Sequence, residues 1–276
     1  MASLEGRRLD GLTVVLDGSH GANAHVAPDV VRSLGARVHA IGDDPDGANI
    51  NDGVGSTDPE TCGAAVVEIG ADVGLAFDGD ADRVVAVDHQ GRVVDGDHMM
   101  ALLAVDRHRR GTLVDDTFVV TVMTNLGFHR AMAAAGIHVE QTQVGDRYVL
   151  EALERGGWSL GGEQSGHVIL TDISRTGDGL LTGLQLLDLV QRSGRPLADL
   201  AAEAMTTVPQ LLRNVEVRDR SVDIVSEVAD EIAAVQAELG DDGRVLVRPS
   251  GTEPLVRVMV EAIAPEHAEA AAARLV

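Results

Sequence analysis

Four charged residues in one short loop offer the clearest chemistry in this sequence. Asp78, Asp80 and Asp82 alternate along a loop that ends in Arg83, directly after an apolar run that predicts a buried strand. Carboxylates at alternate positions of an extended loop converge on one point, and such hard oxygen ligands suit Mg²⁺ or Mn²⁺. A calcium-binding helix–loop–helix pattern is excluded, because Arg83 stands where its glycine is required and His89 where its glutamate is. A solvated acidic loop is the alternative, but Arg83 beside the carboxylates favours a phosphoryl ligand.

A second polar loop follows the residues Gly161 and Gly162, whose lack of a side chain lets the backbone approach a ligand closely. Alternation along an extended chain predicts that Glu163, Ser165 and His167 share one side, where they would bind sugar hydroxyls. The imidazole of His167 is also a candidate for proton transfer near neutral pH. The alternative is a polar hairpin turn with no ligand.

A third loop runs from Arg248 to Thr252 and precedes a predicted strand that carries Arg257. Two arginines, the hydroxyls of Ser250 and Thr252, and the backbone N–H groups around Gly251 are suited to a phosphate monoester. The alternative is a Pro/Gly turn with incidental charge. Because the whole chain carries a formal net charge of −22, arginines gathered at one turn favour the phosphate interpretation.

The composition of the chain limits the fold classes and the kinds of partner that are expected. Its 276 residues are 45% hydrophobic, yet only three Phe, one Tyr and one Trp are present, so aliphatic cores of parallel sheets covered by helices are expected. The strong negative charge excludes nucleic acid and anionic membranes as expected partners. Cys62 is the only cysteine, which excludes a disulfide framework, and no apolar run has the length of a signal peptide or membrane span. We therefore expect a cytoplasmic protein.

The order of periodic segments predicts three domains of an α/β protein. Two βαβ-type modules, expected at residues 1–92 and 93–206, should each form a three-layer α/β/α structure, and a smaller α+β domain should follow at 207–276. The helical pattern continues to the last residue of the sequence, which indicates a shortened last domain. The expected strands are 12–16, 37–41, 73–77, 84–87, 118–123, 138–143, 158–162, 168–171, 211–217, 245–247 and 256–261. The expected helices are 26–34, one beginning at 58–60, 97–107, 126–135, 147–155, 177–192, one beginning at 196, 224–239 and 266–275, with a turn at 91–96.

Together, and in this order, the three loops resemble those of the α-D-phosphohexomutase superfamily. The sequences Gly-Gly-Glu-Gln-Ser-Gly-His and Arg-Pro-Ser-Gly-Thr-Glu-Pro-Leu-Val-Arg look like the phosphoglucosamine mutase branch, and the segment 144–149 is similar to that branch as well. The resemblance covers essentially the whole chain and implies domains II, III and IV of a four-domain enzyme. It implies an isomerase of carbohydrate metabolism that moves a phosphoryl group between two sugar hydroxyls, through an enzyme phosphoserine and Mg²⁺.

The resemblance also assigns roles to individual residues. It implies that Asp78, Asp80 and Asp82 hold one Mg²⁺, that Arg83 faces the metal and the phosphoserine, and that His167 is a catalytic candidate. The residues expected to bind substrate are Arg147, Glu163, Ser165, Arg248, Ser250, Gly251, Thr252 and Arg257. A hexosamine bisphosphate is expected as activator and intermediate.

One element of the family pattern is absent from these 276 residues. The resemblance places the nucleophilic serine in a Ser-His-Asn-Pro loop of domain I, and no such sequence occurs here. Ser19 precedes a histidine, but it follows the first strand of the domain II module and is not expected to replace that serine. We therefore expect a fragment that is inactive alone, with a chain carrying the first domain as its partner.

The function expected from the resemblance is conversion of glucosamine 6-phosphate to glucosamine 1-phosphate, a step towards UDP-N-acetylglucosamine. One alternative is a phosphosugar-binding module or a split-enzyme partner. Another is a phosphomannomutase or phosphoglucomutase, against which the loop between Glu163 and His167 argues.

Overall fold

The computed structural model describes residues 4–217, 224–250 and 254–276, and Gly251 and Thr252 therefore lie outside the described residues. The chain divides into two compact units, which are described in turn. Unit 1 comprises residues 1–124 and 128–206, and unit 2 comprises residues 125–127 and 207–276.

The first sheet of unit 1 combines parallel and antiparallel strands in the order β2-β1-β3-β4-β5. β1 is parallel to β2 and β3, whereas β4 and β5 run antiparallel to their neighbours. Every residue of β3 and β4 is buried, as expected for apolar strands with helices on both sides. The elements are β1 (Thr13–Asp17), α1 (Asn23–Ser33), β2 (Arg37–Ile41), α2 (Pro59–Ile69), β3 (Val73–Phe77), β4 (Val84–Asp88) and β5 (Val93–Val94).

The second sheet of unit 1 repeats this plan in the order β7-β6-β8-β9. β6 is parallel to β7 and β8, and β9 returns antiparallel to β8. In both sheets a hairpin therefore connects the last parallel strand to an antiparallel strand, and these two hairpins contain residues 78–83 and 163–167. The elements are α3 (Gly96–Arg109), β6 (Thr117–Thr121), α4 (Leu126–Ala135), β7 (His138–Thr142), α5 (Asp146–Gly156), β8 (Leu160–Gly162) and β9 (Val168–Leu170), with a 3₁₀ turn at Val114–Asp116.

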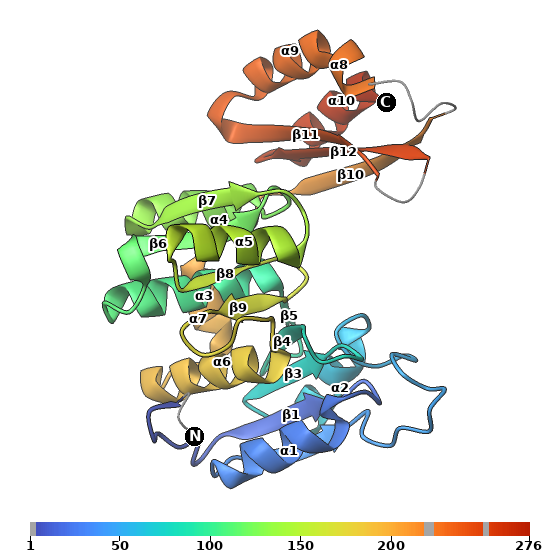
Figure 1. The fold of residues 1–276 in the computed structure, drawn as a ribbon. Coiled ribbons are helices and arrows are strands. Elements are labelled where there is room, and N and C mark those ends of the chain that lie inside the picture. Colours follow the sequence, from blue (N-terminus) through green and yellow to red (C-terminus); the bar gives the residue numbers. More distant parts are fainter. Residues whose placement is uncertain (1–3, 218–223, 251–253) are drawn as a thin grey trace. The chain divides into compact units, whose positions relative to one another are not determined.

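Two further helices, α6 (Gly179–Ser193) and α7 (Leu197–Ala204), complete unit 1. Although α6 follows the second sheet in sequence, it packs on β3 and β4 of the first sheet (Figure 1). Its buried Leu186 and Leu187 belong to the same apolar cluster as Leu75 of β3. Asp178 caps this helix by accepting a hydrogen bond from the Leu181 N–H at 2.9 Å. The two α/β modules are thus joined by a shared core.

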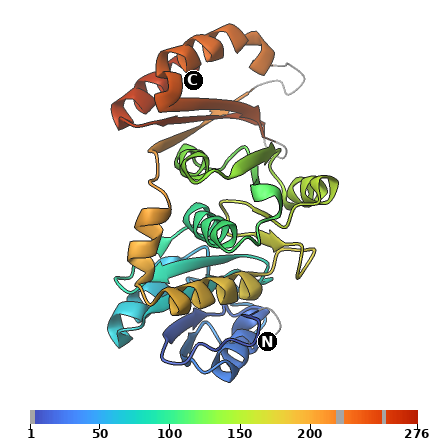
Figure 2. The same ribbon diagram turned by 90° about the vertical axis from the view of Figure 1, so that its left-hand side faces the viewer.

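Unit 2 is a three-stranded antiparallel sheet in the order β10-β12-β11. Its helices lie on one face of the sheet, as Figures 1 and 2 both show. Val258 and Val260 of the central strand pack against alanines of α10 and Val235 of α9 on that face. The elements are β10 (Gln210–Glu216), α8 (Ile224–Glu227), α9 (Ala229–Leu239), β11 (Gly243–Pro249), β12 (Leu255–Ala262) and α10 (Pro265–Leu275), with a 3₁₀ turn at Gly240–Asp242.

The α/β fold class and the α+β texture of the last domain are confirmed, with two local differences. The helix expected at 224–239 is interrupted at Val228, whose φ of −102° and ψ of 13° are not helical. The turn expected at 91–96 contains the short strand β5, because Val94 pairs with Ala86 of β4.

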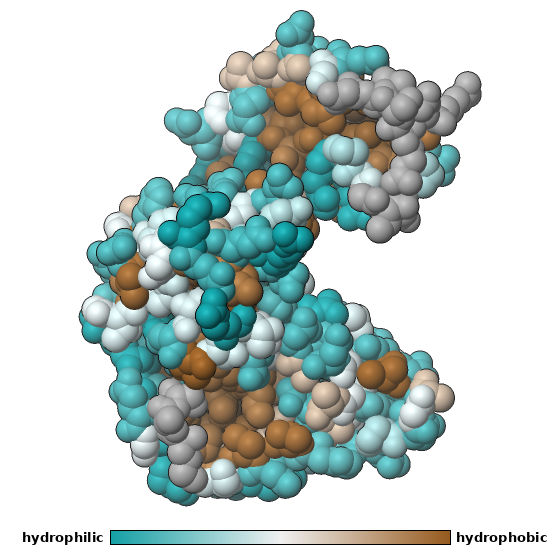
Figure 3. All heavy atoms as spheres, in the orientation of Figure 1, coloured by the Kyte–Doolittle hydropathy of each residue, from teal (hydrophilic) through white to brown (hydrophobic). Residues whose placement is uncertain are grey.

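Hydrophilic residues cover most of the face seen in Figure 3. Among the described residues no helix is long and apolar enough to cross a membrane.

Candidate functional site

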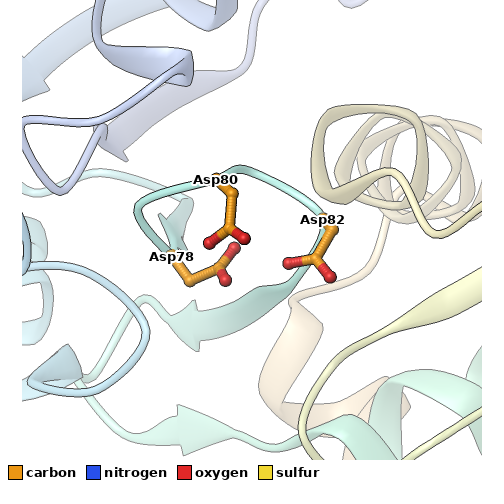
Figure 4. A group of neighbouring side chains, drawn as sticks. All are labelled: Asp78, Asp80 and Asp82. Atoms are coloured by element: carbon orange, nitrogen blue, oxygen red, sulfur yellow. The ribbon is translucent and has the colours of Figure 1, made fainter. Parts of the chain in front are cut away.

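The carboxylates of Asp78, Asp80 and Asp82 converge in the hairpin between β3 and β4 (Figure 4). One oxygen from each lies within 4.8 Å of the others, although no two of these residues are adjacent in sequence. The buried strand β3 ends at Phe77, so the hairpin leaves the sheet edge with Asp78 buried, Asp82 half-buried and Asp80 exposed. We call residues 78–83 the metal loop. Three hard oxygen ligands in this arrangement suit a divalent cation with positions left for a ligand.

Arg83 binds the buried carboxylate of Asp78. Its Nε and Nη2 atoms lie 2.8 Å and 2.7 Å from Asp78 Oδ2, and its backbone N–H donates to Asp78 Oδ1 at 3.0 Å. Burial opposes the charge of the guanidinium, but the neighbouring carboxylates outweigh burial and hold the pKa of Arg83 above its usual value. Arg83 is therefore a permanent cation beside the three aspartates.

The Glu163–His167 segment forms a tight turn, so the expected alternation of its side chains is wrong. Gly166 adopts a φ of +87°, and its N–H donates to the Glu163 carbonyl at 3.0 Å. The Glu163 carboxylate accepts a hydrogen bond from the Gly145 N–H at 3.1 Å, Ser165 is exposed, and His167 is only 4% exposed. The hairpin alternative is thus correct for the backbone, and Glu163 and Ser165 remain accessible at its tip. We call residues 163–167 the sugar turn.

His167 joins the sugar turn to the metal loop. Its Nε2 lies 3.5 Å from Asp82 Oδ2, and its backbone forms an antiparallel bridge with Arg83. Within the described part of the chain, Asp82 Oδ1 and His167 Nδ1 are buried and have no hydrogen-bond partner. Asp82 Oδ1 has only a long ion pair, 3.5 Å from Arg83 Nε, and a metal ion bound by the three aspartates would give this buried oxygen a closer partner. The residues present therefore fit a divalent cation.

Gly177 and Gly179, which the sequence interpretation missed, lie in close contact with the sugar turn and the metal loop. A Cβ at Gly177 would lie 2.2 Å from His167 Nε2, and one at Gly179 would lie 2.5 Å from the Arg83 carbonyl oxygen. The Gly179 N–H also donates to the Ala81 carbonyl at 2.9 Å. The signal in the sequence was the Gly-Asp-Gly segment directly before a long amphipathic helix, in which Asp178 is the cap.

Arg147 lies in the first turn of α5 and is highly exposed. Its Nε atom lies 2.7 Å from Glu151 Oε1, one helical turn later, and 80% of its side chain is accessible. It follows Gly145, whose N–H binds Glu163. Among the described contacts Arg147 has no link to the metal loop, and its role in substrate binding stays a prediction.

In unit 2, Arg248 of β11 and Arg257 of β12 are directly paired across the antiparallel sheet. Burial and the charge of Arg257 lower the pKa of the Arg248 guanidinium, and its Nε has no hydrogen-bond partner among the described residues. Ser250 follows β11 and is 7% exposed, with its N–H donating to the Leu255 carbonyl at 2.8 Å. Two positive charges therefore lie side by side at this end of the sheet, an arrangement that is suited to an anion.

Ser19 is fully buried and unavailable for phosphoryl transfer in this structure. Its hydroxyl donates to the Gly18 carbonyl at 2.7 Å, and its N–H donates to Asp17 Oδ1 at 3.0 Å. Ser19 lies in the loop after β1, where its backbone has a φ of +51°.

The chain belongs to the phosphoglucomutase/phosphomannomutase family. The family's model of α/β/α domain II matches residues 2–91, that of α/β/α domain III matches residues 95–208, and that of the C-terminal domain matches residues 212–276. The chain is 58% identical over 269 residues to a phosphoglucosamine mutase of Thermobifida fusca, and 58% identical over 273 residues to one of Leifsonia xyli. These alignments cover 97% of this chain but only 60% and 59% of the relatives, so the chain spans about three fifths of their length.

Solved structures of the family share this fold. A phosphoglucomutase/phosphomannomutase family protein of Burkholderia thailandensis superposes with a TM-score of 0.80 at 23% identity, covering 99% of this chain and 61% of that one. An N-acetylphosphoglucosamine mutase of Aspergillus fumigatus, solved with GlcNAc-6P and magnesium, gives a TM-score of 0.80 at 20% identity, covering 99% of this chain and 66% of that one. At these identities the likeness supports the fold.

Proposed function

We propose that this chain provides the metal-, sugar- and phosphate-binding parts of a phosphoglucosamine mutase, which interconverts glucosamine 6-phosphate and glucosamine 1-phosphate. The observation that carries the proposal is the meeting of the metal loop with the sugar turn at Asp82 and His167. The 58% identity to phosphoglucosamine mutases over almost the whole chain supports the choice of a hexosamine phosphate.

The proposed roles follow from the chemistry of each group. Asp78, Asp80 and Asp82 would hold one Mg²⁺, which would neutralise charge on a transferring phosphoryl group when bound. Arg83 keeps its positive charge beside this site and would bind phosphoryl oxygens. Glu163 would accept hydrogen bonds from sugar hydroxyls.

Other residues are proposed to bind the sugar and the phosphate of the substrate. Ser165 would bind the sugar, and Arg147 would contribute a mobile positive charge from the start of α5. The phosphate monoester would be bound by Arg248, Ser250, Gly251, Thr252 and Arg257. His167 stays a candidate for proton transfer, although its burial limits direct access to substrate.

We further propose that these 276 residues need a phosphoserine from another segment or chain in order to turn over. They contain no Ser-His-Asn-Pro sequence, and the buried Ser19 is a poor substitute. Without a covalent phosphoryl carrier, positioning and charge stabilisation alone cannot complete the transfer. A hexosamine bisphosphate would act as activator by phosphorylating that serine.

The decisive experiment is a coupled assay for glucosamine 1-phosphate with Mg²⁺ and a sugar bisphosphate. It should be run on the 276-residue chain alone and after addition of a polypeptide carrying the family's phosphoserine domain. We expect activity only after mixing, and greater activity with glucosamine phosphate than with mannose or glucose phosphate. Activity of the chain alone would refute the need for an added phosphoserine, and a preference for mannose or glucose phosphate would refute the assigned substrate.

A further inference from the structure

The metal loop and the sugar turn form one continuous piece of backbone structure. The Val84 N–H donates to the Gly166 carbonyl at 3.2 Å, and Arg83 and His167 form an antiparallel bridge. A Cβ at Gly166 would lie only 2.0 Å from the Val84 carbonyl oxygen. Such close backbone contact leaves little freedom for one hairpin to shift without the other.

The side chain of His167 is enclosed between this bridge and the segment before α6. It is 4% exposed, and Gly177 packs directly against its ring, where a Cβ would lie 2.2 Å from Nε2 and 2.4 Å from Cδ2. The one polar contact that its ring makes among the described residues is with Asp82 Oδ2, at 3.5 Å. The ring is thus held in place by packing and directed at a carboxylate of the metal loop.

The two nitrogens of the ring have different surroundings. Nε2 faces a carboxylate oxygen, which can only accept, so a proton on Nε2 gives attraction whereas a bare lone pair gives repulsion. Nδ1 is buried and has no hydrogen-bond partner within the described residues. Asp82 therefore has one oxygen, Oδ2, facing the imidazole, while its other oxygen, Oδ1, accepts no hydrogen bond among the described residues and has only a long ion pair with Arg83 Nε at 3.5 Å.

We infer that His167 is a positioning residue for the metal, which orients the Asp82 carboxylate towards the cation and thereby links metal binding to the sugar turn. This inference rests on the proposed metal site of the three aspartates. Groups that hold a metal-binding side chain in place typically change metal affinity by about 10- to 100-fold when they are replaced. A role limited to proton transfer would leave metal affinity unchanged.

The test measures cation binding to the 276-residue chain without substrate, by titration calorimetry with Mg²⁺ and by electron paramagnetic resonance of free Mn²⁺. His167→Gln keeps an N–H donor near the position of Nε2 and should stay within about threefold of the unmodified chain. His167→Leu fills similar space without a donor and should bind about 10- to 100-fold more weakly. His138→Ala, at an exposed position of β7, is the control and should bind as the unmodified chain does.

Gly177→Ala provides a second perturbation, because the three atoms nearest to its methyl group would all belong to the His167 ring. Its methyl group would displace the imidazole and should also weaken Mn²⁺ binding, even if His167→Leu does not fold. Circular dichroism and melting curves identify folded variants. Equal Mn²⁺ affinity of the unmodified chain, folded His167→Leu and folded Gly177→Ala would overturn the inference while leaving the metal site intact. Absence of Mn²⁺ binding by the unmodified chain would instead overturn the metal site, and the inference with it.

Discussion

Replacing Arg248 with methionine should stabilise the sheet of unit 2 when no anion is present. Arg248 and Arg257 are paired across β11 and β12, and burial together with the charge of Arg257 lowers the pKa of Arg248. Like charges in this position cost about 0.2–1 kcal/mol. Methionine keeps most of the apolar stem of arginine, so the variant should gain about that amount. Hydrogen exchange of the β11 and β12 amides at low salt measures it.

When phosphate is bound, the unmodified chain should become more stable than Arg248→Met. Added NaCl should shrink the difference, because the Debye length falls to about 8 Å at 0.15 M salt. Inorganic phosphate at ten times its dissociation constant should stabilise the unmodified chain by about 1.4 kcal/mol. The Arg248→Met variant should lose most of this response, because its site has one cation fewer.

Arg244 is the matched control, four residues earlier on the same strand. Its Nη2 lies 2.8 Å from Oε2 of Glu261, which is fully buried, so Arg244→Met leaves a buried carboxylate without its ion pair. That change should cost about 3–5 kcal/mol and should leave the phosphate response intact. If Arg248→Met is destabilised as strongly as Arg244→Met and the unmodified chain does not respond to phosphate, the anion-site argument is wrong.

Three further changes test other parts of the structure. The carboxylate of Asp188 is almost fully buried, and its two oxygens lie 2.7 Å from Arg7 Nε and 2.8 Å from Arg192 Nε. Asp188→Asn should therefore lower the free energy of unfolding by about 2–3 kcal/mol at pH 7. This is less than the about 3–5 kcal/mol of a fully buried pair, because both arginines are partly exposed. Burial raises the pKa of Asp188, but the arginines outweigh burial and hold it below the usual value. The stabilisation from the ionised carboxylate is present above about pH 4 and is lost as pH falls through the folded-state pKa, so the melting curves of variant and parent should converge in acid. As the control, Asp29→Asn at an exposed position should change stability by less than about 0.5 kcal/mol. Ser19→Ala should leave mutase activity of the completed enzyme unchanged, and mass spectrometry should find no phosphate on Ser19 after bisphosphate treatment; loss of activity together with a phosphorylated Ser19 in the parent would refute its exclusion. Gly166→Ala should lower the melting temperature, since its φ of +87° alone costs an alanine roughly 1–3 kcal/mol; an unchanged melting temperature would show that the sugar turn tolerates rearrangement.

Much of the fold could be predicted from local patterns in the sequence. The strands Arg37–Ile41 and Val73–Phe77 and the helix Leu126–Ala135 have the bounds that apolar runs and helical spacing predicted. Where prediction failed, contacts outside the local hydrophobic pattern decided the structure. Val93 and Val94 become a strand because β4 lies beside them, and α6 packs on the first sheet although it follows the second in sequence. The β5 pairing is a local hairpin of only two residues, whereas the packing of α6 is long-range and leaves no signal in the local pattern.

The candidate site divides in the same way between local and distant contacts. The spacing of Asp78, Asp80 and Asp82 predicted that their carboxylates converge, and they do. The same spacing failed for Glu163, Ser165 and His167, because that segment forms a tight turn in which Ser165 is exposed and His167 is buried. The burial of His167 against Asp82 depends on two hairpins from separate sheets and on Gly177 of a third segment. The sequence alone determined which groups could bind a cation, whereas the tertiary structure decided which neighbour orients them, since long-range packing places side chains that sequence distance keeps apart.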